Sequence, residues 1–200
     1  RMVQSPMRPL CFLEVGASMF IGTAKGIYKA TDGEVVLTNP MNEGDLSLRP
    51  TALCLGPGGA LWVATCSGVY QADTNGSWAP VPGLERVCAR ALAVLDHGLF
   101  IGTYGSGAYL FRDGRLYHLP MDNDGFLSHV HAFMADQAGF LWMSTNQGLF
   151  RVRMDDLDHW TRDTTQQVYF AYYGKKSGIR NSEFNGGCSP AFVRTGDGWA

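Results

Sequence analysis

The chain has 200 residues, of which 46% are hydrophobic and 12% aromatic, and its 16 basic and 18 acidic side chains leave a formal charge of −2. This composition predicts a globular protein with ample apolar material for a packed core. The charges do not gather in blocks of one sign, so nucleic acid is not expected as a partner. No apolar stretch reaches the roughly twenty residues of a membrane helix, so any membrane attachment is expected to come from segments outside this sequence.

A short pattern occurs four times along the chain. Each copy reads aromatic, aliphatic, small residue, threonine, and a short polar turn and a glycine follow it. The aromatic is a tryptophan in two copies, at Trp62 and Trp142. The four threonines are Thr23, Thr65, Thr103 and Thr145, and the four glycines are Gly26, Gly68, Gly107 and Gly148. A period of about forty residues in strand-type sequence is typical of a β-propeller with one blade per repeat.

Turn residues divide each repeat into four strands, A to D. In the fourth repeat, the expected strands are Val130–Ala135, Phe140–Thr145, Leu149–Arg153 and an irregular one near His159–Arg162. The expected blades cover residues 10–38, 50–81, 87–119 and 127–162, and residues 187–200 match the start of a fifth. Residues 1–9 are a leading segment and 163–186 a long connection between blades. The sequence therefore predicts an all-β fold, a partial β-propeller over residues 10–200 with four-stranded antiparallel blades, four of them whole and one incomplete.

Each position of the pattern has an expected physical role. The aromatic fills the space between neighbouring blades, and the small residue two positions later keeps that space open for it. The threonine hydroxyl bonds backbone groups of the following turn, and the later glycine suits a positive φ. Seven blades of this length would need roughly 280 residues. We therefore expect the chain to be part of a longer propeller, which either contacts a second copy of itself or is marginally stable alone.

The five cysteines form no C-x-x-C pair and no zinc-type spacing. Cys11, Cys54 and Cys88 lie in apolar runs and are expected as buried thiols. Cys66 lies in a polar turn and is expected to be exposed. Because the number is odd, internal pairing cannot be complete.

Two parts of the chain resemble the two-component regulator propeller repeats of bacterial sensor proteins. The best match is Asp124–Val130 followed by Asp136–Thr145 and Gly148–Arg151. The stretch from Tyr173 to Trp199, with the letters EFNGG at Glu183–Gly187, is similar to the segment that closes the last propeller in these sensors. That wording particularly resembles transmembrane sensors ending in a diguanylate cyclase (GGDEF) or a histidine kinase domain.

The resemblance implies a function as well as a fold. It implies a non-catalytic periplasmic sensor module that relays ligand binding to an output domain outside this chain, with the cyclase or kinase activity in that domain. It implies no cofactor. An oligosaccharide ligand is an expectation by analogy with the family alone.

A ligand is expected at the face formed by the B–C turns and the D–A loops, where residues escape the packing of the blades. The candidates there are Lys25, Tyr104, Asn146, Gln147, Asp122 and Asn123. Tyr104 and Asn146 stand out, because an aromatic ring together with amides suits a sugar. The alternative is that these residues only solvate their turns.

Metal and enzymatic sites have weaker support in the sequence. His129 and His131 would share one side of a strand, but no third ligand is evident, and Asp155, Asp156 and Asp158 lack the spacing of a calcium loop, so no metal site is expected. A propeller lyase or glycosidase would need two carboxylates, or a histidine and a carboxylate, near the central channel. The repeats place no acid at an inward strand position. A scaffold for protein partners remains the other alternative.

Overall fold

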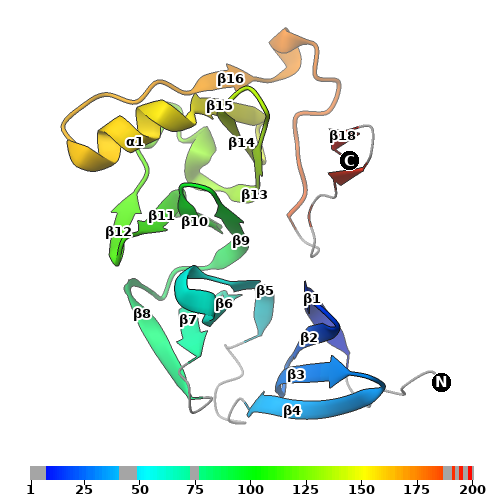
Figure 1. Cartoon of the computed structure of the whole chain (residues 1–200). Coiled ribbons are helices and arrows are strands. Elements are labelled where there is room, and N and C mark those ends of the chain that lie inside the picture. Colours follow the sequence, from blue (N-terminus) through cyan, green and yellow to red (C-terminus); the bar gives the residue numbers. More distant parts are fainter. Residues whose placement is uncertain are drawn as a thin grey trace. The chain divides into compact units, whose positions relative to one another are not determined.

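The protein is described here by a computed structural model, which defines residues 8–40, 49–72, 77–186, 191, 194–195 and 198–199 (Figure 1). The chain divides into two compact units, one from residues 1–89 with 188–200 and the other from residues 90–187. Among the described residues, no helix is both long and apolar enough to cross a membrane. Cys188 and most of the expected leading segment lie outside the described residues.

The first unit contains two four-stranded antiparallel sheets in which each strand pairs with its neighbours in sequence. One sheet consists of β1 (Pro9–Val15), β2 (Ser18–Thr23), β3 (Gly26–Thr31) and β4 (Glu34–Pro40). The other consists of β5 (Pro50–Leu55), β6 (Leu61–Thr65), β7 (Gly68–Ala72) and β8 (Trp78–Glu85), with a 3-10 turn at Pro57–Gly59. A short hairpin of β17 (Arg194–Thr195) and β18 (Gly198–Trp199) completes the described part of this unit.

The second unit repeats the same arrangement. Its first sheet consists of β9 (Ala89–Leu95), β10 (Gly98–Thr103), β11 (Ala108–Arg112) and β12 (Arg115–His118). Its second sheet consists of β13 (Val130–Ala135), β14 (Phe140–Thr145), β15 (Leu149–Arg153) and β16 (Ala171–Tyr173), with 3-10 turns at Phe126–Ser128 and Lys175–Ser177. Four four-stranded antiparallel sheets confirm the predicted all-β class.

The prediction of a fourth strand near His159–Arg162 is wrong. These residues belong to a helix, α1 (Met154–Arg162), and the strand that pairs with β15 is β16 (Figure 1). Met154, Leu157 and Trp160 recur every three residues and are buried, so they form one apolar face of the helix. Asp155 and Asp156 in the first turn favour a helix start through the helix dipole.

The repeat threonines fulfil their expected role in all four blades. Each hydroxyl donates to the carbonyl of the repeat glycine, from Thr23 to Gly26 at 2.9 Å and from Thr103 to Gly107 at 2.8 Å. The same oxygen accepts a backbone N–H of the turn, for example from Ser106 at 3.0 Å. The repeat glycines all have positive φ, and a Cβ on Gly68 would lie 2.9 Å from the Leu84 carbonyl.

Phe100 fills the space between the two sheets of the second unit, as expected. It is fully buried, and its ring centroid lies 5.6 Å from that of Phe133 on the next blade. Burying a ring of this size stabilises the fold by about 2 to 3 kcal/mol. Trp142 departs from this role, because it is only half-buried and its Nε1 donates to Asp136 Oδ2 at 2.7 Å.

The structure confirms the prediction for two of the cysteines and corrects it for Cys88. Cys11 and Cys54 are buried free thiols, as expected, and burial raises the pKa of each to about 12. Cys88, however, forms a disulfide with the exposed Cys66. The backbone explains the pairing, because Arg86 N–H donates to the Ser67 carbonyl at 3.0 Å and so holds the chain after β8 beside the turn that carries Cys66.

Candidate functional site

The candidate site begins at an irregularity of strand pairing that recurs in β1, β5 and β13. The pairing of β13 with β14 shifts between Val130 and Ala132, so His131 has no opposite residue. The same shift skips Thr51 in β5. Arg90 in β9 lies 13 residues before its repeat threonine, Thr103, whereas His131 lies 14 residues before Thr145. A bulge of this kind takes a side chain out of the normal alternation and is common beside functional sites.

A cavity of about 290 Å³ lies next to these positions in the second unit. Its lining comes from β9, from β13, from the turns after β10 and β14, and from the segment of residues 183–186. The lining residues are Arg90, Tyr104, His131, Asn146, Glu183, Asn185 and Gly186. Polar and aromatic groups from both blades of this unit therefore meet in one hollow.

His131 is the most deeply buried polar residue of the cavity, with 4% of its surface exposed. Its Nε2 lies 2.6 Å from Asn146 Oδ1, an arrangement in which Nε2–H donates and Nδ1 keeps its lone pair. That Nδ1 is buried and has no hydrogen-bond partner in the described part of the chain. Burial chiefly, with the nearby positive charge of Arg90, holds the pKa of His131 below its usual range, although the bond to Asn146 opposes the shift. His131 is therefore neutral at pH 7.

Tyr104 presents an open ring at the cavity, because half of its surface is exposed. The Arg90 guanidinium carbon lies 5.7 Å from the centre of that ring, and the His129 ring meets it edge-on at 4.2 Å. Arg90 Nε is buried and makes no hydrogen bond among the described residues. The site thus combines an aromatic surface with a cation that has no bonded partner for Nε.

The segment of residues 183–186 forms one wall of the cavity. Phe184 N–H donates to the Thr145 carbonyl at 3.2 Å, which fixes this wall to the end of β14. Gly186 lies so close to the His131 ring that a Cβ added there would overlap the imidazole. Only glycine therefore lets the wall close over His131.

The structure brings together two of the six residues that the sequence singled out, Tyr104 and Asn146. Gln147 is exposed in the same turn as Asn146, and its carbonyl accepts a bond from the Tyr172 hydroxyl at 2.8 Å. Asp122 serves its own loop, with Oδ1 accepting from Leu127 N–H at 2.7 Å. The remaining two lie elsewhere: Asn123 is exposed on the loop of Asp122, and Lys25 is exposed in the first unit.

Sequence reasoning missed Arg90 and Glu183, and it considered His131 only as a possible metal ligand. One signal could have found two of them, since Arg90 and His131 are polar residues within apolar strands, 13 and 14 residues before their repeat threonines. Within the described residues, no group of three or more histidine, cysteine or acidic side chains could hold a metal ion.

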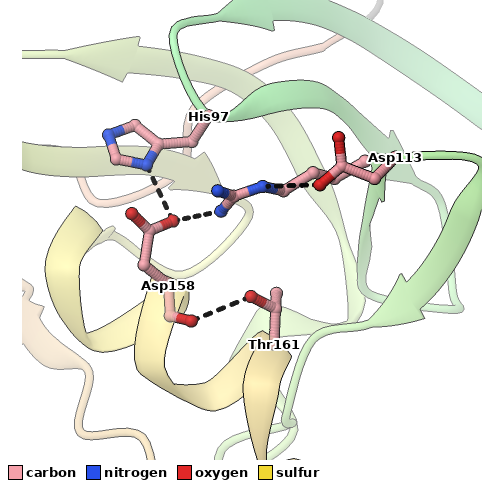
Figure 2. Close-up of polar contacts among 5 residues, drawn as sticks. His97, Asp113, Asp158 and Thr161 are labelled. Carbon is pink, nitrogen blue, oxygen red and sulfur yellow. Dashed lines mark hydrogen bonds and ion pairs between the residues drawn. The ribbon is translucent and has the colours of Figure 1, made fainter.

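A second polar cluster joins α1 to the preceding blade (Figure 2). Asp158 Oδ1 accepts from Arg112 Nη1 and lies 2.8 Å from His97 Nδ1. Burial opposes ionisation of Asp158, but the bonds from His97 and Arg112 hold its pKa below the usual range. Asp155 instead pairs with Arg153 at 3.3 Å, so the carboxylates after β15 do not converge on one point.

No family model matches the chain, and no curated protein matches it. Solved structures do. A protein described as the extracellular domain of the hybrid two-component system BT3049 from B. thetaiotaomicron has a TM-score of 0.69 at 18% identity, over 96% of this chain and 26% of that one. Virginiamycin B lyase from Staphylococcus aureus has a TM-score of 0.64 at 14% identity, over 98% of this chain and 62% of that one.

An ancestral GH74 enzyme also matches, with a TM-score of 0.58 at 16% identity, over 74% of this chain and 23% of that one. The chain spans about a quarter of the length of the two-component protein and of the GH74 enzyme. At these identities the likenesses establish the propeller-type fold alone.

Proposed function

We propose that the chain is the ligand-binding β-propeller module of an extracytoplasmic bacterial sensor protein, and that the cavity of the second unit is its ligand site. The observation that carries this proposal is the convergence of Tyr104, Asn146 and the buried His131, whose Nδ1 has no bonded partner among the described residues. A buried polar atom without a partner costs about 1 to 3 kcal/mol, which a bound ligand would recover. Such groups are tolerated mainly at functional sites.

Two further observations support an extracytoplasmic place. The similar structure from B. thetaiotaomicron is described as an extracellular domain. The bond between Cys66 and Cys88 is of a kind that persists in oxidising compartments such as the periplasm.

The ligand proposed is an oligosaccharide or another small hydroxylated molecule. The open ring of Tyr104 offers a flat apolar surface for the C–H face of a sugar ring. The Asn146 amide and His131 Nδ1 supply a donor and an acceptor for hydroxyl groups.

Signal output in this proposal belongs to a domain outside the chain, a diguanylate cyclase or a histidine kinase. Ligand binding would change how two copies of the propeller associate, and a linker would carry that change across the membrane.

Calorimetric titration of the full chain with a panel of oligosaccharides tests the ligand site. We expect saturable binding that Tyr104→Ala weakens about tenfold, since it removes the stacking surface. Tyr169→Ala is the matched control, because Tyr169 is exposed but lies outside the cavity. Binding of a protein partner alone would favour the scaffold alternative, and equal binding by both variants would place the ligand elsewhere.

One observation favours catalysis as a second candidate function. His131 and Glu183 line the same cavity, and a neutral histidine beside a carboxylate is a combination that acid–base catalysis uses. A virginiamycin B lyase of similar fold is catalytically inactive as a histidine-to-alanine variant. Lyase and hydrolase assays on the full chain test this candidate, and turnover that His131→Ala abolishes would replace the sensor proposal.

A further inference from the structure

We propose that the cavity of the second unit selects a ligand bearing a carboxylate group, which Arg90 binds, on a hydroxylated body that the rest of the cavity holds. The inference rests on the proposed function, because it names the chemical class of the ligand at that same site. It goes beyond that function in assigning selectivity to Arg90, a residue of β9.

Arg90 is held ready for a planar anion. Its guanidinium carbon lies 5.7 Å from the centre of the Tyr104 ring, within the range of a cation–π contact. Its Nε–H is buried and donates no bond among the described residues, where Arg90 also forms no ion pair. A carboxylate meets Nε–H and an adjacent Nη–H with two parallel bonds, the geometry that a guanidinium prefers.

Arg90 differs from other arginines of this unit in what surrounds its guanidinium, although Arg151 Nε is likewise buried without a bonded partner among the described residues. Arg112 gives its guanidinium to Asp158 and Asp113. Arg151 is enclosed by the rings of Phe140, Trp142 and Tyr173 at 4.3 to 5.4 Å. Arg90 alone of these three lines a cavity, with one ring beside it.

Glu183 also lines the cavity but does not neutralise Arg90. The described residues contain no ion pair between them, and Glu183 is exposed, so water screens its charge. Glu183 is therefore available to accept bonds from ligand hydroxyls, while the shielded guanidinium carries the stronger attraction for an opposite charge.

The remaining groups favour a neutral hydroxylated body. Asn146 Oδ1 is engaged by His131, which leaves the Asn146 amide nitrogen as a donor. His131 Nδ1 is an acceptor. A sugar acid such as a uronic acid combines a carboxylate, several hydroxyls and a flat C–H face for Tyr104.

Calorimetry of the full chain with D-glucuronate and with D-glucose tests the inference. We expect D-glucuronate to bind at least tenfold more tightly than D-glucose. Arg90→Gln should remove this preference, and Arg90→Lys, which keeps the charge but not the fork, should reduce it. Arg115→Gln is the matched control, because Arg115 also lies over a tyrosine ring, that of Tyr117 at 5.5 Å, yet is outside the cavity.

A second variant tests whether the ligand carboxylate lies near the charge of Glu183. Glu183→Gln removes a negative charge near the ligand carboxylate, so we expect D-glucuronate to bind more tightly by about twofold or more. Weaker binding of D-glucuronate by this variant would mean that no ligand carboxylate lies near Glu183 in the cavity, and it would overturn the inference.

Two other outcomes would also overturn it. Equal affinity for D-glucuronate and D-glucose would refute selection by Arg90 while leaving the proposed saccharide sensor intact. No binding of D-glucuronate at millimolar concentration would refute the ligand class, whereas the proposed function would still be judged by the oligosaccharide panel. Circular dichroism of each variant confirms that the fold is retained.

Discussion

The hydroxyl of each repeat threonine makes two hydrogen bonds within its own turn, one as donor and one as acceptor. The hydroxyl of Thr103 donates to Gly107 and accepts from Ser106, and the residue is completely buried. Burial makes these bonds more important than at the surface, because water cannot replace either partner. The threonine is therefore a structural requirement of the turn that places Tyr104 at the cavity.

Replacing Thr103 by valine tests this role. The change keeps the shape of the side chain but leaves the Ser106 N–H without its partner and the buried Gly107 carbonyl with only the Thr103 N–H. We therefore expect a loss of about 1 to 3 kcal/mol in the free energy of unfolding. Thr165→Val removes an exposed threonine hydroxyl and should cost much less. Urea denaturation of both variants measures the difference, and equal losses would contradict the explanation.

Only some residues of the candidate site could be predicted from the sequence. The repeat pattern allowed Tyr104 and Asn146 to be identified from the sequence, because turn positions after the threonines do not take part in the packing of the blades. Arg90 and His131 do not stand out in the sequence as site residues, because a residue in an apolar strand is expected to face the core. The bulge that redirects the His131 side chain leaves little trace in one sequence. Glu183 was missed because a segment between blades has no repeat to fix its path.

The helix α1 is the element that departs most from the repeat. The chain after Arg153 has no counterpart in the other blades, so a strand was expected there by analogy with them. The spacing of Met154, Leu157 and Trp160 nonetheless follows a helix, and these side chains pack into the core of the second unit. The helix is joined to the preceding blade through Asp158 (Figure 2).

Asp158→Asn should weaken this attachment. It removes a charge that accepts bonds from His97 and Arg112, and we expect a loss of about 1 to 2 kcal/mol at pH 7, reduced by the partial exposure of the group. Asp156→Asn, on the exposed side of the same helix, should cost less. Chemical denaturation compares the two, and an equal effect would show that the cluster does not hold the helix.

The contribution of Asp158 to stability should depend on pH. The folded-state pKa of Asp158 lies below the ordinary aspartate value of 3.8, so its stabilisation is complete above that value and is lost as the pH falls through the folded-state pKa. The stability difference between the wild-type protein and Asp158→Asn should therefore shrink below about pH 4. A difference that grows as the pH falls below about 4 would contradict this assignment.

Each of the two units is built from two four-stranded sheets. The disulfide belongs to the first unit. The period of the sequence predicted the sheets and most of their strands, because each strand is bounded by its own turn residues. It could not predict the disulfide, because that depends on how the chain after β8 folds back beside the turn of Cys66.

Loss of the disulfide should destabilise the protein. Cys66 and Cys88 are 22 residues apart, and a closed loop of this size stabilises by about 3 kcal/mol in the loop-entropy treatment. We expect a reducing agent to lower the urea midpoint of the wild-type protein, and to have no effect on the double variant Cys66→Ser, Cys88→Ser. A wild-type midpoint unchanged by complete reduction would contradict the prediction.

The proposed function depends on ligand binding in the cavity beside His131. Nitrogen-15 NMR of the histidine side chains reports on this atom by atom. When a saccharide found to bind by calorimetry is added, the Nδ1 signal of His131 should shift and saturate at the same ligand concentrations. Saturable binding that leaves both ring nitrogens of His131 unchanged would contradict the claim.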